Sequence, residues 1–230
     1  MLMSKRSFLT ASAGLVAVGA SGLLLPRSAR ASTPLPLTPA ADLGPFYPME
    51  KLLDSDLDLT RIRGKSGRAK GEIVEVSGRI LTTDGTPQPH ARIEIWQANA
   101  AGRYAHANDR RLDVPLDPHF QGYADLRADA QGNFRFLTVK PGMYPAGSFQ
   151  RAPHIHLDVR GRQQRLVAQM YFPADEALLK QDKVLMHDLW GKAAPMPSNV
   201  FGQLQPGGSK VEAGAAHYRY DIVLFDGQLG

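Results

Sequence analysis

Two histidines separated by one residue stand in the segment QRAPHIHLDV, which covers residues 150–159. The segment has the alternating apolar pattern of a β-strand, in which every second side chain points to the same face. His154 and His156 are therefore predicted to lie side by side, with Arg151 three positions upstream of the pair. Burial of two imidazoles on one face requires partners for four ring nitrogens, and a metal ion satisfies two of them at once.

The histidine pair by itself leaves several interpretations open. It is compatible with two half-buried strand residues that bind nothing. It is also compatible with a zinc or ferrous site, because Asp158 is predicted on the same strand face and both metals accept carboxylate beside imidazole. The remaining histidines are scattered through loop-like or strand-end segments, where exposed or capping roles are expected: His90, His106, His119, His187 and His217.

Ligands other than sulfur must be considered, because the chain contains no cysteine. This excludes disulfides, thiolate nucleophiles, iron–sulfur clusters and zinc-finger sites, and leaves His, Tyr, Asp, Glu or backbone oxygen as metal ligands. Two tyrosines stand in glycine-containing turns. Tyr104 ends the run IWQANAAGRY, and Tyr144 lies in KPGMYP, ten residues before His154. Tyrosine in a turn is usually an amphipathic plug, so neither residue indicates a ligand on its own.

Short apolar alternations separated by turn residues predict an all-β fold, a single β-sandwich domain over 71–230 with long functional loops. The turns are DGTPQP, DAQG and PGMYP, and a helix is expected only at 175–183. Long connections at 105–127 and 185–214 are where such a scaffold usually carries its site. The predicted strands cover 72–81, 91–98, 132–139, 154–161, 165–172 and 217–225.

The N-terminal residues 1–31 have the organisation of a signal peptide. A basic start is followed by an uncharged apolar run over 8–25 and by the small-residue pattern Ala29-Arg30-Ala31. A membrane helix is the alternative, but the glycines in the run favour cleavage and no stable anchor afterwards. The sequence SKRSFLT resembles a twin-arginine export signal with Lys5 before Arg6. We therefore expect export to the periplasm, followed at 32–70 by a Pro-rich tether and an N-terminal arm.

The net charge of +5 arises almost entirely from this leader. It holds Lys5, Arg6, Arg27 and Arg30 and no acidic residue, so the rest of the chain has 23 basic and 22 acidic residues. A nearly neutral domain without a basic patch argues against nucleic acid as a partner.

Four motifs between Trp96 and Phe172 together resemble those of the intradiol ring-cleavage dioxygenases: W-Q-A-N…G-R-Y, K-P-G-x-Y-P, R-x-x-H-I-H and Q-x-Y-F, in this order. A weaker similarity extends from GPFYP, at 44–48, to YDIVLF near the C-terminus. The resemblance implies a β-sandwich fold and non-haem Fe(III) as the cofactor. It also implies that a catecholic ring is cleaved by O2 between its two hydroxylated carbons, to give a cis,cis-muconate-type diacid.

The resemblance also implies roles for individual residues. Tyr104, Tyr144, His154 and His156 correspond to the four iron ligands. An unperturbed tyrosine has a pKa near ~10, so only a strong cation such as Fe(III) keeps two phenols ionised at neutral pH. Tyr144 corresponds to the ligand that leaves the iron and acts as a base when substrate binds. Arg151 corresponds to the residue that stabilises negative charge on the substrate.

Two further positions match the family's substrate pocket. Gln169, in QMYF, and Phe46, in GPFYP, are expected to line it, whereas Trp96 is expected in the core. The segment between residue 32 and the first predicted strand shows no helical period, which favours the protocatechuate-like branch. That branch uses a companion subunit, so we expect a homo-oligomer or a companion chain. The connection YPAGSFQRAPH is shorter than the corresponding connection in that branch. Ala146 stands at a position where that branch has an aromatic residue.

Two other classes of protein are compatible with parts of this pattern. A non-catalytic β-sandwich binding module would use the same scaffold without bringing the four ligands together. A Zn or Fe(II) enzyme would use His154, His156 and Asp158 and would not depend on Tyr104. Export also suggests larger or exogenous catechols as substrates, on grounds of location only.

Overall fold

A computed structural model describes residues 33–51, 56–174, 176–190 and 196–225. The predicted signal peptide at 1–31 lies outside the described residues. Within them, no helix is long and apolar enough to cross a membrane. The described residues contain three short helical segments, α1 (Glu176–Leu179), the π-helical η1 (Leu185–Trp190) and the 3-10 turn η2 (Ser198–Val200). The strands are β1 (Ile73–Thr82), β2 (Arg92–Trp96), β3 (Tyr123–Arg127), β4 (Asn133–Val139), β5 (Tyr144–Ala146), β6 (Phe149–Arg151), β7 (His154–Arg160), β8 (Arg165–Tyr171), β9 (Gln203–Leu204), β10 (Ala216–Arg219) and β11 (Ile222–Leu224).

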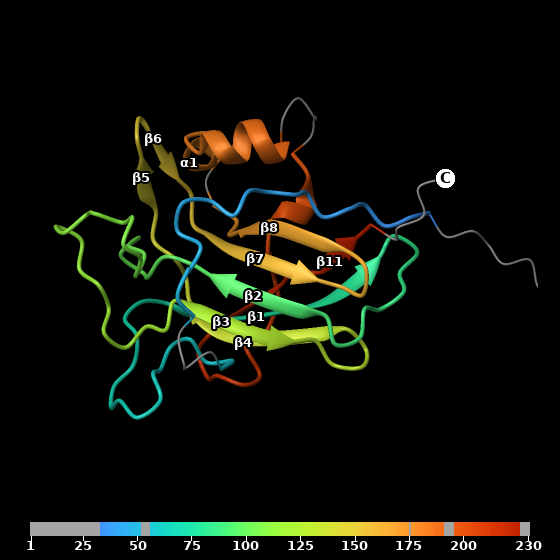
Figure 1. The fold of residues 1–230 in the computed structure, drawn as a ribbon, viewed down its shortest axis with the longest axis horizontal. Coiled ribbons are helices and arrows are strands. Elements are labelled where there is room, and N and C mark those ends of the chain that lie inside the picture. The colour runs from blue at the N-terminus through green and yellow to red at the C-terminus, as the bar shows by residue number, and fades with distance from the viewer. Residues whose placement is uncertain (1–32, 52–55, 175, 191–195, 226–230) are drawn as a thin grey trace, which may run out of the picture. The chain divides into compact units, whose positions relative to one another are not determined.

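Two sheets pack face to face, which confirms the predicted all-β sandwich (Figure 1). One sheet has the order β11-β1-β10-β9, with β4 also paired to β1, and the other has the order β3-β2-β7-β8. The core between them is formed by alternate residues of both sheets, among them Val76, Phe136, Ile95 and Leu157, all of which are buried. Alternation of apolar side chains along short strands is what such a two-layer core requires.

The same alternation decides where the histidine pair lies. In β7 the side chains of Ile155, Leu157 and Val159 enter the core. His154 and His156 therefore point to the other face of the sheet, away from the sandwich interior. An outward-facing pair can be buried only if something else covers this face of β2, β7 and β8.

The N-terminal arm, residues 33–51, provides part of this cover (Figure 1, blue). The segment that we expected as a tether is extended, and its backbone is bonded to the sandwich at three points. Its amides donate to carbonyl groups: Leu35 to Thr83 (2.7 Å), Thr38 to Val223 (3.1 Å) and Ala41 to Val167 (2.8 Å). The arm thereby brings GPFYP to the end of β7 that carries the histidines.

The predicted single strand at 217–225 is wrong, because the chain forms two strands, β10 and β11, on either side of Tyr220. Both strands pair with β1 in parallel, but the chain between them crosses over Gly78. A Cβ atom on Gly78 would lie 1.9 Å from the carbonyl oxygen of Tyr220, and the Tyr220 amide donates to the Ser77 carbonyl at 2.8 Å. The close crossing interrupts the ladder, and a residue without a side chain permits it.

Three other predictions of secondary structure need correction. The expected long connection at 105–127 contains β3, whose small residue Ala124 weakens the apolar alternation. The segment PGMYP, which was predicted as a turn, also contains the start of a strand, because its Tyr144 begins the β5–β6 hairpin. The helix expected at 175–183 is described only as α1, at Glu176–Leu179. It does not continue through Asp182, whose carboxylate accepts the backbone amides of Val184 and Leu185 instead.

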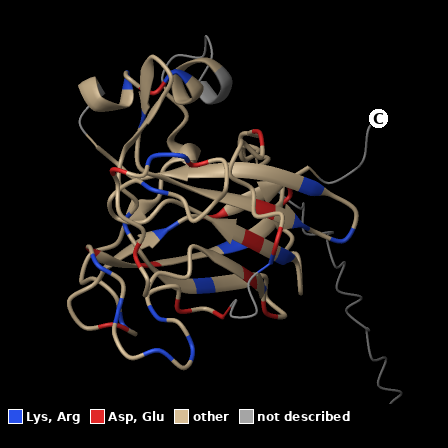
Figure 2. Cartoon of the chain, turned by 60° about the vertical axis from the view of Figure 1, so that its left-hand side comes forward, with Lys and Arg blue, Asp and Glu red and all other residues tan. Residues whose placement is uncertain are grey.

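Glu94 is the centre of a charged network between the arm and the sheet, and only 1% of it is exposed. Its carboxylate accepts hydrogen bonds from the hydroxyls of Tyr123 (2.7 Å) and Tyr47 (3.1 Å), and Lys51 Nζ lies 2.9 Å away. Burial acts to raise the pKa of Glu94, but the bonds from Tyr123 and Lys51 outweigh it and lower the pKa to about 2. Figure 2 shows that acidic and basic positions are interspersed across the strands of the sandwich.

The Glu94 network predicts a pH dependence of stability. A lowered carboxyl pKa stabilises the fold above the unfolded-state pKa, near 4.5, and this contribution is lost as the pH falls toward about 2. Glu94→Gln should therefore lower the free energy of unfolding at pH 7 by roughly 3 kcal/mol, and this loss should shrink below pH 4.5. Urea unfolding at several pH values measures this, with exposed Glu50→Gln as the control. A loss of unfolding free energy that does not change with pH would contradict the lowered pKa of Glu94.

Candidate active site

His154 and His156 form a buried pair at the start of β7, with 1% and 2% of their surfaces exposed. Their Nε2 atoms are 3.2 Å apart, as the strand alternation predicts. His154 Nδ1 lies 2.6 Å from the carbonyl oxygen of Ala152, so it donates there and leaves the lone pair on Nε2. Burial, assisted by Arg151, lowers the pKa of His154 well below its usual value and that of His156 to about 3. Both imidazoles are therefore neutral, which is the form that binds metal.

The ring of His156 is held between Trp96 and Gly44. Trp96 is stacked on it, with ring centroids 4.8 Å apart and planes inclined by 13°. On the arm, Gly44 has φ of +71°, and a Cβ atom there would stand 3.4 Å from His156 Cε1. Trp96 is buried, as expected, in a cluster that includes both predicted tyrosine ligands. The strand and the arm thus leave the imidazole little freedom to rotate.

Tyr104 and Tyr144 reach the histidines from two loops that pack backbone against backbone. Each tyrosine follows a glycine by two positions, in GRY and in GMY. A Cβ atom on Gly102 would lie 2.0 Å from the Met143 carbonyl oxygen, and one on Gly142 would lie 2.5 Å from the Ala100 carbonyl oxygen. The two glycines therefore allow a contact that no other residue could make.

The four predicted ligands are thereby brought together. The ring centroids of Tyr104 and Tyr144 are 5.4 Å apart, those of Tyr144 and His154 5.8 Å, and those of Tyr104 and His156 6.4 Å. The buried hydroxyl of Tyr104 has no hydrogen-bond partner among the described residues. A buried polar atom is rarely left without a partner, so this hydroxyl indicates a group that completes the site.

The electrostatics of the tyrosines fit a cation as that group. Burial raises the pKa of Tyr104 well above its ordinary value, and the neighbouring Tyr144 raises it further. Burial also raises the pKa of Tyr144, against the opposing effect of Arg151. The protein alone therefore keeps both phenols neutral. A hard cation among two phenols and two neutral imidazoles would ionise the phenols and satisfy the Tyr104 oxygen.

Arg151 is positioned by the β5–β6 hairpin, whose register places it opposite Tyr144. The contact between Arg151 Nη1 and Tyr144 Oη measures 3.5 Å. Nη2 donates to Gln169 Oε1 at 2.6 Å and to Tyr171 Oη at 3.1 Å. One edge of the guanidinium is therefore held by β8, and another faces a predicted ligand.

Asp182 holds the remaining edge of Arg151, and sequence analysis did not single it out. Its carboxylate is fully buried and accepts from Arg151 Nε at 3.1 Å and from the Ala152 amide at 2.9 Å. It also accepts the amides of Val184 and Leu185. One acid in an expected helix carries no sequence signal for such a role, because its four partners come together only in the fold.

The W-Q-A-N motif has a structural role that the sequence did not reveal. The Gln97 side chain donates to the Val139 carbonyl at 2.9 Å and ties β2 to the end of β4. Asn99 Oδ1 accepts the amides of Ala101 and Arg103 and shapes the turn that precedes Tyr104. Farther along, Asp109 Oδ2 accepts the Tyr104 amide at 2.8 Å. Asn99 and Asp109 thus fix the backbone on both sides of this tyrosine.

Phe46 and Gln169, the predicted pocket residues, lie in different surroundings. Phe46 stacks on Tyr104, with ring centroids 4.4 Å apart, and lines a cavity of about 500 Å³ together with Tyr144 and Arg151. Gln169 is buried, and its side-chain oxygen accepts hydrogen bonds from Arg151 and from the Tyr171 hydroxyl. It is not among the described residues that line the cavity, and its contact with substrate stays a prediction.

The set His154, His156 and Asp158 is not assembled. Asp158 is buried, but its carboxylate accepts from Arg165 Nε at 2.9 Å and from Arg160 Nη2 at 3.1 Å. In the described part of the chain, no three His, Asp or Glu side chains are grouped so that they could hold a metal ion. The remaining histidines that were expected outside the site do not complete such a group. The structure therefore contradicts the Zn or Fe(II) alternative built on Asp158.

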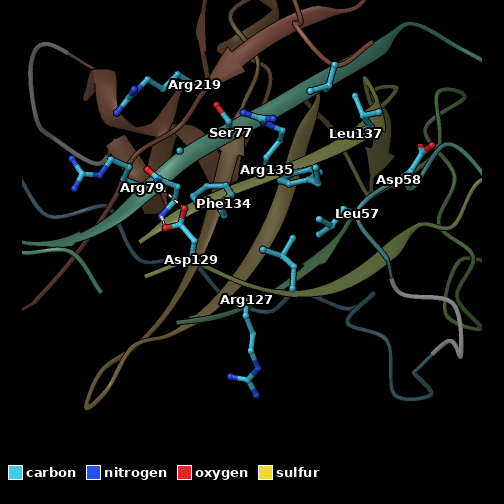
Figure 3. A pocket seen from close by; sticks show the side chains of 15 residues that line it. Leu57, Asp58, Ser77, Arg79, Arg127, Asp129, Phe134, Arg135, Leu137 and Arg219 are labelled. Carbon is cyan, nitrogen blue, oxygen red and sulfur yellow. Dashed lines mark hydrogen bonds between the residues drawn. The ribbon is translucent and has the colours of Figure 1, made fainter. Parts of the chain in front are cut away.

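A second cavity lies on the β1–β4 face, away from these residues (Figure 3). It is an open groove of about 690 Å³, lined by Arg79, Arg127, Phe134 and Arg135 among others. Although it is the larger of the two, its described lining contains no tyrosine or histidine. The smaller cavity is the one that two predicted site residues, Tyr144 and Arg151, line.

Comparison with known proteins identifies the class to which this fold and site belong. A family described as Dioxygenase (Dioxygenase_C) matches residues 43–226. The protocatechuate 3,4-dioxygenase beta chain of Burkholderia cepacia is 40% identical over 185 residues, which are 78% of this chain and 76% of the relative. The chain belongs to the intradiol ring-cleavage dioxygenase family, and the resemblance inferred from its motifs is confirmed. The hydroxyquinol 1,2-dioxygenase of Nocardioides simplex is 29% identical over 81% of this chain and 64% of its own length.

Solved structures agree on the fold. The 3-chlorocatechol 1,2-dioxygenase of Rhodococcus opacus 1CP has a TM-score of 0.58 at 18% identity, covering 82% of this chain and 72% of that one. A dioxygenase domain from Streptomyces sp. SirexAA-E, part of a fusion with a carbohydrate-binding protein, has a TM-score of 0.57 at 20% identity. It covers 83% of this chain and 99% of its own. At such identities the likeness concerns the fold alone.

Asp182→Asn should lower the free energy of unfolding by about 3 kcal/mol, because it leaves the Arg151 guanidinium buried without its counter-charge. The matched control is Glu72→Gln, since Glu72 lies 3.9 Å from Lys140 in an exposed pair. That control should cost less than about 1 kcal/mol. Denaturant unfolding at pH 7 measures the free energy of unfolding of both variants. Equal losses in the two would show that the buried pair of Arg151 and Asp182 stabilises the fold no more than an exposed pair does.

Proposed function

We propose that the chain is a non-haem Fe(III) dioxygenase that cleaves a catechol-type ring between its two hydroxylated carbons with O2. The product is a cis,cis-muconate-type diacid, and a protocatechuate-like substrate is favoured. The observation that carries the proposal is the meeting of two buried phenols and two neutral imidazoles beside a cavity that Arg151 also lines. Membership of the family supports the reaction type.

Tyr104, Tyr144, His154 and His156 would hold the iron. Ferric iron bound by these residues would supply Lewis-acid chemistry that activates a deprotonated catechol toward O2. The donor set suits this ion, since phenolate is a hard anionic oxygen and the imidazoles are neutral. The stacking of Trp96 and Phe46 on His156 and Tyr104 would keep two of the ligands oriented.

Proton transfer from the substrate needs a base at the cavity wall, and Tyr144 is the ligand that lines the cavity. In its ionised form Tyr144 Oη can accept a proton from a catechol hydroxyl, which then leaves a neutral phenol. The nearby Arg151 opposes the rise in the pKa of Tyr144, so it stabilises the ionised form. The one carboxylate among the described lining residues, Asp109, is bonded to Arg111 and to the Tyr104 amide.

Arg151 would stabilise negative charge on the substrate oxygens. Its guanidinium is fixed by Asp182 and Gln169, and it lines the cavity beside Tyr144. A fixed cation in a site with little water stabilises developing charge without reorganisation. Phe46 supplies an apolar wall against which an aromatic ring can pack.

The names of the relatives support the substrate preference. The relative at 40% identity is a protocatechuate 3,4-dioxygenase chain, whereas the hydroxyquinol enzyme is 29% identical. Because the first relative is a beta chain, we also infer that this chain assembles with a companion subunit or with copies of itself. The competing class, a non-catalytic binding module, gives no reason for the four side chains to meet.

The proposed ligands are tested by visible absorption and iron content. Purified protein supplied with iron should show a broad tyrosinate-to-Fe(III) band, and the band should shift when catechol or protocatechuate is added without oxygen. Tyr104→Phe and His154→Ala should lose most of the iron. Tyr220→Phe is the matched control, because the Tyr220 hydroxyl is also buried without a described partner but lies elsewhere. A colourless protein, or normal iron in the ligand variants, would reject the ligand set.

The role of Arg151 is tested separately from iron binding. Arg151→Ala should lower kcat about a hundredfold or more, because it removes a charge that acts on the reacting oxygens. Iron should remain, and Asp182→Asn controls for loss of the buried ion pair. Wild-type kcat in Arg151→Ala would exclude the role.

We also propose that residues 1–31 direct export to the periplasm. Expression of the full chain in a Gram-negative host should yield periplasmic protein whose mass lacks this segment. Replacement of Lys5 and Arg6 by glutamine should retain the full-length chain in the cytoplasm if the route is of the twin-arginine type. Cytoplasmic, uncleaved wild-type protein would refute export.

A further inference from the structure

The cavity beside Tyr144 has an apolar wall and a basic wall. Its apolar wall consists of Phe46, Pro145, Ala146, Phe149 and Val184. The small side chain of Ala146 leaves space in the hairpin that carries Tyr144. This wall suits an aromatic ring and supplies no group that could bind a charged substituent.

The basic wall carries an unbalanced positive charge. The described lining contains three arginines, Arg110, Arg111 and Arg151, but one acid, Asp109. Arg111 Nε donates to Asp109 Oδ1 at 2.8 Å, so these two charges neutralise each other. Arg151 is paired with Asp182.

Arg110 is the arginine that remains. It is exposed, and no hydrogen bond or ion pair joins its side chain to the described residues. Its neighbours on both sides are nevertheless held. The side chain of Asn108 donates to the Pro45 carbonyl on the arm at 3.0 Å, and Arg111 Nη2 donates to the Gly102 carbonyl at 2.7 Å. The guanidinium thus stands on a fixed segment at the wall of the substrate cavity, with its donors available.

We propose that Arg110 is a specificity-determining residue that binds an anionic substituent, a carboxylate, on the catechol ring. The inference rests on the proposed function, and it places this recognition within the chain itself. A planar guanidinium binds a carboxylate through two parallel hydrogen bonds, which neither neutral wall residues nor the paired arginines can supply. Catechols without a charged substituent would not use it.

The test compares kcat/KM for protocatechuate and for catechol in the iron-loaded full chain. Arg110→Gln should lower the ratio of the two values about tenfold, mainly through the KM for protocatechuate, because one charge-assisted interaction is lost. Arg110→Lys should recover part of the ratio. Arg127→Gln is the control, since it removes an exposed arginine at the distant groove and should leave the ratio at the wild-type value.

The outcomes separate this inference from the proposed function. If the wild-type protein converts neither substrate and shows no tyrosinate band, the proposed function fails. If it converts them and Arg110→Gln keeps the wild-type ratio, only the role of Arg110 is overturned. Equal effects of Arg110→Gln and Arg127→Gln would show that overall charge, not this position, is responsible.

Discussion

The burial of four ionisable side chains on the outer face of one sheet is the constraint on which the rest of the structure depends. Two imidazoles with 3.2 Å between their Nε2 atoms cannot both be protonated, and two buried phenols resist ionisation. Such a cluster is costly unless a cation compensates it. The Tyr104 hydroxyl, which lacks a partner among the described residues, marks where a cation would be bound.

The surrounding structure serves to cover this face and to stiffen it. The arm is bonded to the sandwich through its backbone and through the Glu94 network, and it places Gly44 on His156. Two loops that pack against each other at Gly102 and Gly142 position Tyr104 and Tyr144 on another side of the histidines. Asp182 joins Arg151 to the start of η1 through one buried carboxylate. Rigid support of this kind holds ligands at set positions before any metal or substrate binds.

Sequence reasoning succeeded where a local pattern decides the outcome. The period of two in HIHLDV predicted the face shared by the histidines, and the alternating segments predicted the sandwich. It failed where the outcome depends on distant contacts. The strand expected at 217–225 is split because Tyr220 crosses Gly78. The helix ends before Asp182, whose carboxylate accepts the amides of Val184 and Leu185 and also binds the distant Arg151.

By itself, the sequence determined the residue types of the site and the fold class. The H-x-H pair, the two G-x-Y turns and the absence of cysteine restrict the chemistry, because donor atoms and strand period are local properties. Only the tertiary structure decided which of these residues meet. It excluded Asp158 by pairing it with Arg165, and it brought in Asp182 and Arg110. Such choices depend on strand register and loop packing, which arise between segments far apart in the chain.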